Sequence, residues 1–319
     1  MSTPYDDLPS MAMFARVVQL RSFSAAARDA GVAKSAVSKR IAALEARLGV
    51  RLLVRTTRKL ALTEDGLRFY EHCAALVAAA QAAEDAVSES SGLARGPLRI
   101  NSSVAFAELY LARAIAEFLR AYPDVTAQLT IDDRFVDLAE GGFDLVVRIA
   151  GRLTGAMVAR RLATDHTVVC AAPGYLARAG TPRTPADLLQ HNCLRYALIP
   201  AQHEWRFRAA GGTRVSVPIR GNLVASSGTA LREAAIAELG LAVTPRFMIA
   251  RELAAGALVT VLDGQLAGDM GIFAVQPDRK HVPARVRLLV DFLARWFAGP
   301  DWVTRGFAAS ARSAPPTRR

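Results

Sequence analysis

The chain has 319 residues, of which 52% are hydrophobic and 22% charged, and its formal net charge at pH 7 is +11. This length exceeds one ordinary hydrophobic core and predicts two or three domains. No run of about 18 apolar residues occurs, which argues against a transmembrane helix. The acidic N-terminus lacks the apolar stretch of a secretory signal. We therefore expect a cytoplasmic protein with no membrane partner.

Cysteine and histidine spacing argues against a metal site. Cys73, Cys170 and Cys193 are odd in number and far apart, and the five histidines form no HxxxH or HExxH pattern. Cys170 and Cys193 lie in apolar strand contexts and are interpreted as core residues; a thiol sensor, the alternative, requires an exposed cysteine. GxSxG, P-loop and GxGxxG motifs are absent. We expect no enzymatic activity and no cofactor.

Most of the positive charge lies in one segment, between Met11 and Leu62. It holds eleven basic and two acidic residues, a net charge of +9. A solvated face with chance clustering is one interpretation. A surface that faces DNA phosphates is the interpretation we favour.

Helical periodicity predicts three helices in this basic segment, over about 13–20, 24–30 and 34–48. Ser22 and Ser24 offer hydroxyls that could cap the second helix. Gly31 supplies the positive φ of a tight turn, and Val32 is expected to pack against the core.

The third helix is predicted to enter the major groove. Its apolar residues Val37, Ile41, Leu44 and Leu48 form one stripe, and the opposite face is small, basic and rich in hydroxyls. Residues 50–62 alternate hydrophobic and basic side chains, as in a β-wing. The residues expected to bind DNA are Ser24, Lys34, Ser35, Ser38, Lys39 and Arg40, the last at the groove edge, with Arg55, Thr56 and Arg58 on phosphates. For each serine, capping of a helix is the alternative.

A long helix is predicted to start at Thr63, an N-cap followed by acidic residues. Apolar residues then recur at alternating spacings of four and three, the period of a coiled coil. These residues are Phe69, Cys73, Leu76, Ala80, Ala83 and Val87. A weak dimer seam is the favoured interpretation, and packing of the helix on its own domain is the alternative.

After Pro97 strands alternate with helices, which predicts an α/β fold with largely parallel sheets in two lobes. The predicted domains are a winged helix-turn-helix over 1–66, a linker and dimerisation helix over 67–90, a hinge over 91–97, a two-lobed α/β domain over 98–298 and a disordered basic tail over 299–319. Within the α/β domain, lobe I covers about 98–162 and 272–298, and lobe II about 163–271.

Ordered motifs across the basic segment strongly resemble the LysR-type transcriptional regulators. They include Ser22-Phe-Ser-Ala-Ala-Ala27, Ser35-Ala-Val-Ser38, Leu48-Gly49 and Leu62-Thr-x-x-Gly66. The resemblance continues to about residue 297, for example in Phe143-Asp-Leu-Val-Val-Arg-Ile149. It implies an all-α winged helix-turn-helix domain, a long linker helix and a two-lobed α/β domain like a periplasmic solute-binding protein.

The same resemblance implies promoter DNA, a small-molecule effector, RNA polymerase and further copies of the chain, as a homodimer or tetramer, as partners. A solute-binding module or an enzyme on the same two-lobed fold is the alternative function. Three positions depart from the family pattern. Lys34 replaces a common glutamine, Arg21 replaces the usual glycine, and Glu238 stands where a small residue is usual.

The effector is expected between the lobes, at the carboxyl ends of strands. Two serine-rich turns there precede helices and could bind an anion, and an arginine could pair with a carboxylate. By resemblance, the effector-binding residues are Ser102, Ser103, Arg148, Ile149, Ser226, Ser227 and Gly228. Ordinary loop caps are the alternative for the serines. Phe106 and Trp205 could line the cleft or belong to the core.

Overall fold

The computed structural model describes residues 7–55, 60–90, 94–134, 142–151, 153, 157–199, 203–208, 213–266, 269–277, 282–299 and 302–304. The chain forms two compact units, which divide after Leu93, with residues 140–142 assigned to the first unit. No helix among the described residues is long and apolar enough to cross a bilayer.

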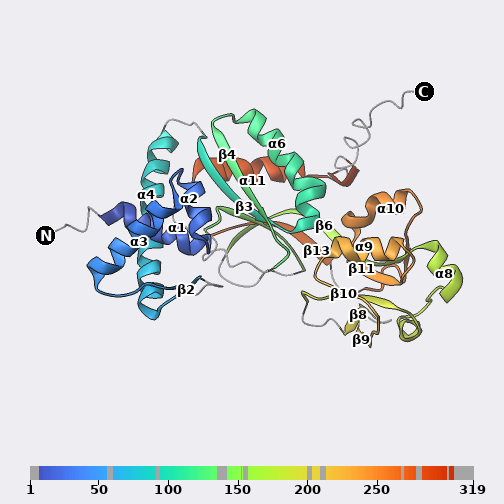
Figure 1. Cartoon of the computed structure of the whole chain (residues 1–319). Helices are drawn as coiled ribbons and strands as arrows, with labels where there is room; N and C mark the ends of the chain where they lie inside the picture. The colour runs from blue at the N-terminus through green and yellow to red at the C-terminus, as the bar shows by residue number, and fades with distance from the viewer. Residues whose placement is uncertain are drawn as a thin grey trace, which may run out of the picture. The chain divides into compact units, whose positions relative to one another are not determined.

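The first unit is a winged helix-turn-helix, as the sequence predicts (Figure 1). Its elements are α1 (Leu8–Gln19), α2 (Phe23–Asp29), α3 (Lys34–Leu48), β1 (Leu53–Arg55), β2 (Leu60–Leu62) and α4 (Glu64–Ser90). Strands β1 and β2 pair antiparallel, with Leu53 opposite Leu62. The helices close on one hydrophobic core, so the apolar stripe of α3 is buried.

Hydroxyl caps start two of these helices where the sequence predicts them. The Ala25 N–H donates to Ser22 Oγ at the start of α2, and the Gly66 N–H donates to Thr63 Oγ1 at the start of α4. Ser24 lies inside α2 and is half-buried, so it is not the cap.

The turns after α1 and α2 use the same capping motif. After α1, the Ser22 N–H donates to the Val17 carbonyl and the Arg21 N–H to the Val18 carbonyl; the equivalent pair closes α2 around Gly31. Both motifs require a left-handed residue, and Arg21 has φ +49° whereas Gly31 has φ +65°. Val32 completes the second turn with its backbone, and its side chain is 44% exposed, so its predicted packing against the core is wrong.

The predicted seam of α4 divides into two parts. Cys73 is buried in the core of the first unit, and the Phe69 ring lies 5.6 Å from that of Phe14. Ala80 and Ala83 are exposed in the single chain. The first part of the seam therefore packs on its own domain, and only the second part remains available to a partner.

The second unit contains a mixed sheet with helices packed on its faces (Figure 1). Its strands are β3 (Gly96–Ser102), β4 (Val125–Ile131), β5 (Leu145–Ala150), β6 (Val158–Ala171), β7 (Cys193–Tyr196), β10 (Val224–Ala225), β11 (Leu241–Pro245), β12 (Val259–Val261) and β13 (Asp269–Gln276). The order across the described sheet is β10-β7-β11-β6-β13-β5-β3-β4, and β12 also pairs with β6. Strands β8 (Glu204–Arg208) and β9 (Arg214–Pro218) form a separate hairpin.

The helices of this unit begin with a continuous segment of α5 (Val104–Phe106), a π-helical turn (Ala107–Leu111) and α6 (Ala112–Ala121). The others are α8 (Pro173–Ala179), η3 (Pro185–Gln190), α9 (Gly228–Ile236), η4 (Arg246–Ile249), α10 (Ala250–Ala254) and α11 (Ala284–Trp296). Helices α6 and α11 pack together near β3 and β4, and α9 packs on β7 and β11. The sequence did not predict α8, η3, η4, α10 or β12.

The prediction of largely parallel sheets fails in the middle of the sheet. β3 is parallel to β4 and β5, and β7 is parallel to β10 and β11. The two long strands β6 and β13 instead run antiparallel to each other and to their neighbours. Each spans a predicted lobe boundary, at 162/163 and 271/272, and their pairing is irregular between Ile272 and Phe273.

Several sequence predictions concern the ends of the described segments. The sequence also predicts a short helix over 135–140, which lies outside the described residues, as do residues 91–93 of the expected hinge. Strand β3 begins at Gly96, inside that hinge. Trp302, placed by the sequence in a disordered tail, is 4% exposed and packs on the rings of Phe106 and Tyr110.

We predict that Arg21→Gly stabilises the first unit by about 1 kcal/mol, because a left-handed arginine is strained and glycine is not. Thermal unfolding of the full-length protein, followed at the transition of this unit, should show a rise in Tm of about 4–8 °C. Arg21→Ala is the matched control, since it removes the charge and keeps the strain. Equal Tm values for the two variants would contradict the assignment.

Candidate DNA and effector sites

The outer face of α3 presents the predicted DNA-binding side chains. Lys34, Ser35, Lys39 and Arg40 are exposed, and Ser38 is half-buried. The opposite stripe of Val37, Ile41 and Leu44 is at most 1% exposed. Packing of this stripe fixes which face of α3 is turned to solvent, and that face is basic and hydroxyl-bearing.

The N-terminus of α3 has no side-chain cap. Its N-cap is Ala33, and the first turn holds no acidic residue. In contrast, α2 and α4 begin at hydroxyl caps. The first backbone N–H groups of α3 and the positive end of its dipole therefore remain able to bind an anion.

Both acidic residues of the basic segment make internal contacts. Asp29 pairs with Arg16, whose Nε lies 2.5 Å from Asp29 Oδ2. Glu45 Oε1 accepts the N–H groups of Leu52 and Leu53, at 2.8 and 3.0 Å. The carboxylate of Glu45 thus ties the start of β1 to α3, a role that the sequence did not reveal.

The wing is described only in part. Arg55 ends β1, where its backbone pairs with Leu60, and its side chain lies outside the description. Thr56 and Arg58 also lie outside the described residues. Thr63 Oγ1 donates to the Arg51 carbonyl at 2.7 Å and so anchors the base of the wing to the start of α4.

Four of the predicted effector residues lie together at the carboxyl ends of β3 and β5. Ser102 ends β3 opposite Val147 of the parallel strand β5, next to Arg148 and Ile149. Three buried polar atoms in this place have no hydrogen-bond partner among the described residues: Asn101 Oδ1, Ser102 Oγ and Ser103 Oγ. Buried polar atoms are normally satisfied, so this position is suited to a polar ligand or water.

Charges of both signs surround these serines. Ser103 is the N-cap of α5 without using its hydroxyl, and the Val104 N–H donates instead to Asp133 Oδ1 at 2.9 Å. Burial, and then the charge of Asp133, raises the pKa of Tyr196 to about 12. Burial lowers the pKa of Arg148. Asp133 and Tyr196 were missed, because neither lies in a motif.

The second serine-rich turn begins α9. The Ala230 N–H donates to Ser227 Oγ at 3.3 Å, which makes Ser227 the helix cap, while Ser226 is exposed. A Cβ atom on Gly228 would lie 2.9 Å from Met248 Cε, so the Met248 side chain lies against this glycine. Ser227 thus caps a helix in the structure, which is the alternative that the sequence left open for this serine.

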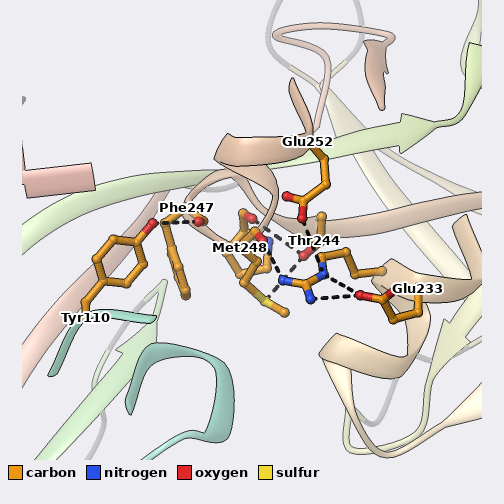
Figure 2. Close-up of polar contacts among 8 residues, drawn as sticks. Tyr110, Glu233, Thr244, Phe247, Met248 and Glu252 are labelled. Carbon is orange, nitrogen blue, oxygen red and sulfur yellow. Dashed lines mark hydrogen bonds and ion pairs between the residues drawn. The ribbon is translucent and has the colours of Figure 1, made fainter. Parts of the chain in front are cut away.

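Phe247 and Met248 of η4 contact the helices that follow the two serine-rich turns, and Figure 2 shows the contact of Phe247 with Tyr110. The buried Tyr110 hydroxyl, on the helix that follows Ser103, donates to the Phe247 carbonyl at 2.8 Å. The Phe247 N–H donates to the buried carboxylate of Asp165 on β6 at 3.2 Å. Next to it, Met248 packs on Gly228. The described contacts therefore connect the two turns through η4 rather than directly.

An arginine fixes the other side of η4. Arg232 of α9 pairs with Glu233 at 2.8 Å, lies 3.9 Å from Glu252, and donates to the Met248 carbonyl at 3.4 Å. Figure 2 shows Glu233 and Glu252 on either side of this contact. The backbone at Met248 is therefore held from α9 as well as from β6.

The aromatic and cysteine candidates are core residues. Phe106 is fully buried and Trp205 is 7% exposed. Burial raises the pKa of Cys73 to about 11 and those of Cys170 and Cys193 to about 12, so all three thiols stay protonated at neutral pH. These buried thiols lack the exposed, electropositive surroundings of a reactive cysteine.

Glu238, the third departure from the family pattern, is the left-handed residue after α9. It has φ +61°, and the Leu239 N–H donates to the Ala234 carbonyl, as in the turn after α1. Arg178 donates to both the Glu238 carboxylate and its carbonyl, at 3.1 and 3.0 Å. Glycine would adopt this backbone conformation without strain, and the glutamate that stands here pairs with Arg178.

Two family models match the chain. Residues 8–67 match the bacterial regulatory helix-turn-helix protein of the lysR family, and residues 91–298 match the LysR substrate binding domain.

Curated relatives match over nearly the full length. A probable HTH-type transcriptional regulator, LtrA from Klebsiella pneumoniae, is 34% identical over 90% of this chain and 94% of its own. The HTH-type transcriptional regulator DmlR from Escherichia coli K12 is 32% identical over 91% of this chain and 94% of its own.

Solved structures of full-length regulators are also similar. The Vibrio cholerae virulence activator AphB superposes with a TM-score of 0.63 at 27% identity, over 92% of this chain and all of its own. CrgA of Neisseria meningitidis gives 0.59 at 31% identity, over 91% and 99%. Because these relatives are regulators, the alternatives of an enzyme or a solute carrier are not supported. The chain belongs to the LysR family and is a DNA-binding transcriptional regulator with a C-terminal domain that binds a small-molecule effector.

Proposed function

We propose that the chain reads promoter DNA with the outer face of α3. The observation that carries this proposal is an exposed basic face opposite a fully buried stripe, on a helix with an uncapped N-terminus. Lys34, Ser35, Ser38 and Lys39 meet base edges, and Arg40 lies at the groove edge. Ser24 of α2, with Arg55, Thr56 and Arg58 of the wing, contacts the backbone and sets affinity and register.

The effector of this proposal is a small organic anion, and a carboxylate fits best. Its oxygens accept from the Ser102 and Ser103 hydroxyls and pair with the guanidinium of Arg148. Ile149 supplies apolar contact. Ser226, Ser227 and Gly228 approach from the other lobe, where the N-terminus of α9 favours negative charge. Asn101 Oδ1, Ser102 Oγ and Ser103 Oγ, buried at the end of β3 without a hydrogen-bond partner among the described residues, support this assignment.

The effector acts, in this proposal, by changing the angle between the two lobes. Lobe I, about 98–162 and 272–298, and lobe II, about 163–271, are joined by the long strands β6 and β13. A ligand held by both serine-rich turns stabilises one lobe arrangement over another. Through residues 91–97 this alters the linker helix, the bending of DNA and the contact with RNA polymerase, in a homodimer or tetramer paired along the second part of α4.

We predict that Arg55→Ala weakens binding to every DNA sequence alike, because a phosphate contact carries no base information. The slope of log K against log salt concentration should fall by about 0.9, the loss of one phosphate contact. Fluorescence anisotropy with the upstream region of the gene and with unrelated duplexes measures both quantities. Arg68→Ala is the control, because Arg68 is already paired with Glu64 and Asp65. A changed sequence preference at constant slope contradicts the wing assignment.

We predict that Ser103→Ala separates ligand affinity from stability. Because Ser103 Oγ has no hydrogen-bond partner among the described residues, the free energy of unfolding without ligand should stay within about 0.5 kcal/mol of wild type. Affinity for the effector should fall by about tenfold through the loss of a hydrogen bond to a charged group.

Thermal shift with a panel of aliphatic and aromatic carboxylates first finds the compounds that stabilise the wild type. Titration of each compound then compares Ser103→Ala with Ser216→Ala, an exposed serine on β9. Equal affinities of the wild type and Ser103→Ala for every such carboxylate would remove Ser103 from the site.

A further inference from the structure

A hollow lies on the hairpin side of lobe II. It has a volume of about 450 Å³, within the usual range of small-molecule pockets. Three basic side chains line it, Arg195, His203 and Arg220, together with the apolar side chains of Leu189, Pro218 and Ile219. No acidic residue is among the residues that line the hollow. Its lining thus combines positive charge with apolar surface.

Arg195 is the central basic residue of this hollow. One of its terminal nitrogens donates to His203 Nδ1 at 2.8 Å, so the neutral imidazole of His203 carries its proton on Nε2. The Arg195 Nε atom is buried and has no hydrogen-bond partner among the described residues. A buried guanidinium N–H without an acceptor is costly, and a ligand oxygen would satisfy it.

The hollow is separate from the proposed effector site. Along β7, Leu194 and Tyr196 belong to the core that contains Phe106 and Phe247, whereas Cys193 belongs to the second core, with Trp205 and Phe207. Because side chains alternate along a strand, Arg195 lies on the same side as Cys193, away from Tyr196. The two sites therefore lie on opposite faces of β7.

The backbone around the hollow is held by close contacts. The Ile219 N–H donates to the His203 carbonyl at 2.9 Å, and the Cys193 N–H donates to the Arg220 carbonyl at 2.8 Å. A Cβ on Gly221 would lie 1.9 Å from the Cys193 carbonyl oxygen, so the chain packs here as closely as only glycine allows. The backbone that carries Arg195 and Arg220 is therefore held in place before any ligand binds.

We propose that this hollow is a second ligand site, which binds a small organic anion such as an aromatic carboxylate. The carboxylate accepts hydrogen bonds from Arg195 and Arg220, since guanidinium groups bind planar oxyanions with two parallel N–H donors. The apolar part of the ligand lies against Leu189, Pro218 and Ile219. Binding of the ligand in this hollow requires both charge pairing with the arginines and apolar contact.

This site lies directly before the second serine-rich turn in the chain. The Arg195 N–H donates to the Leu223 carbonyl at 3.0 Å, and β10 leads from there to Ser226. The segment between Arg220 and Ser226 is short. An anion that holds Arg220 and Arg195 restrains this segment at two points, at Arg220 itself and at Leu223 through Arg195. The second ligand thereby stabilises the segment that carries Ser226, Ser227 and Gly228.

The test uses 4-fluorobenzoate as the probe and the full-length protein, with affinity measured by fluorine NMR titration. Arg195→Gln/Arg220→Gln should weaken probe binding by about tenfold or more, through the loss of two charge-assisted contacts. Arg220→Gln alone, at an exposed side chain, gives a smaller loss in the same direction and does not endanger the fold. Arg208→Gln, an exposed arginine on β8 outside the hollow, is the matched control and should bind like wild type.

Three further measurements separate the alternatives. Ser102→Ala/Ser103→Ala should retain probe binding at the hollow, which distinguishes it from the effector site. The neutral 4-fluorobenzamide should bind about tenfold more weakly than the probe if the charge is required. Inorganic phosphate should not displace the probe, because it lacks an apolar part. Unchanged affinity in Arg195→Gln/Arg220→Gln, equal binding of the amide, loss of binding only in the serine variant, or full displacement by phosphate overturns the proposal.

Discussion

The burial of one apolar stripe on α3 decides how this protein meets DNA. Val37, Ile41 and Leu44 close the core formed with α1, α2 and the first part of α4, so the helix cannot rotate without exposing them. Burial of such side chains contributes about 1.5–3 kcal/mol each. The basic face is therefore fixed outward. Glu45 extends the same constraint to the wing, because its carboxylate holds the start of β1 through two backbone N–H groups.

In the second unit, the corresponding constraint is the contact of η4 with the helices that follow the two serine-rich turns. Phe247 is held by Tyr110 and Asp165, and Met248 by Arg232 and by packing on Gly228. A ligand that binds both turns must therefore either strain or stabilise these buried contacts of η4. The long strands β6 and β13 join the lobes, and Asp165 of β6 also holds Phe247 of η4. Motion of the lobes and contact with the ligand therefore depend on the same residues.

Local patterns in the sequence predicted much of this arrangement. The stripe of α3 and the caps at Ser22 and Thr63 follow from periodicity and side-chain chemistry. Long-range contacts were not predictable in this way. The antiparallel β6 and β13, the burial of Trp302 and the capping of Val104 by Asp133 each depend on partners far away in the chain. Val32 was mispredicted because its hydrophobicity suggested burial, whereas only its backbone completes the turn.

The most direct test of the central claim reverses one charge on the outer face of α3. Lys39→Glu in the full-length protein should lose about tenfold or more of its affinity for its own upstream region and show a weaker dependence on salt. Arg208→Glu changes the net charge equally on the other unit and should bind like wild type. If Lys39→Glu retains both the affinity and the salt dependence of the wild type, the outer face of α3 does not meet DNA.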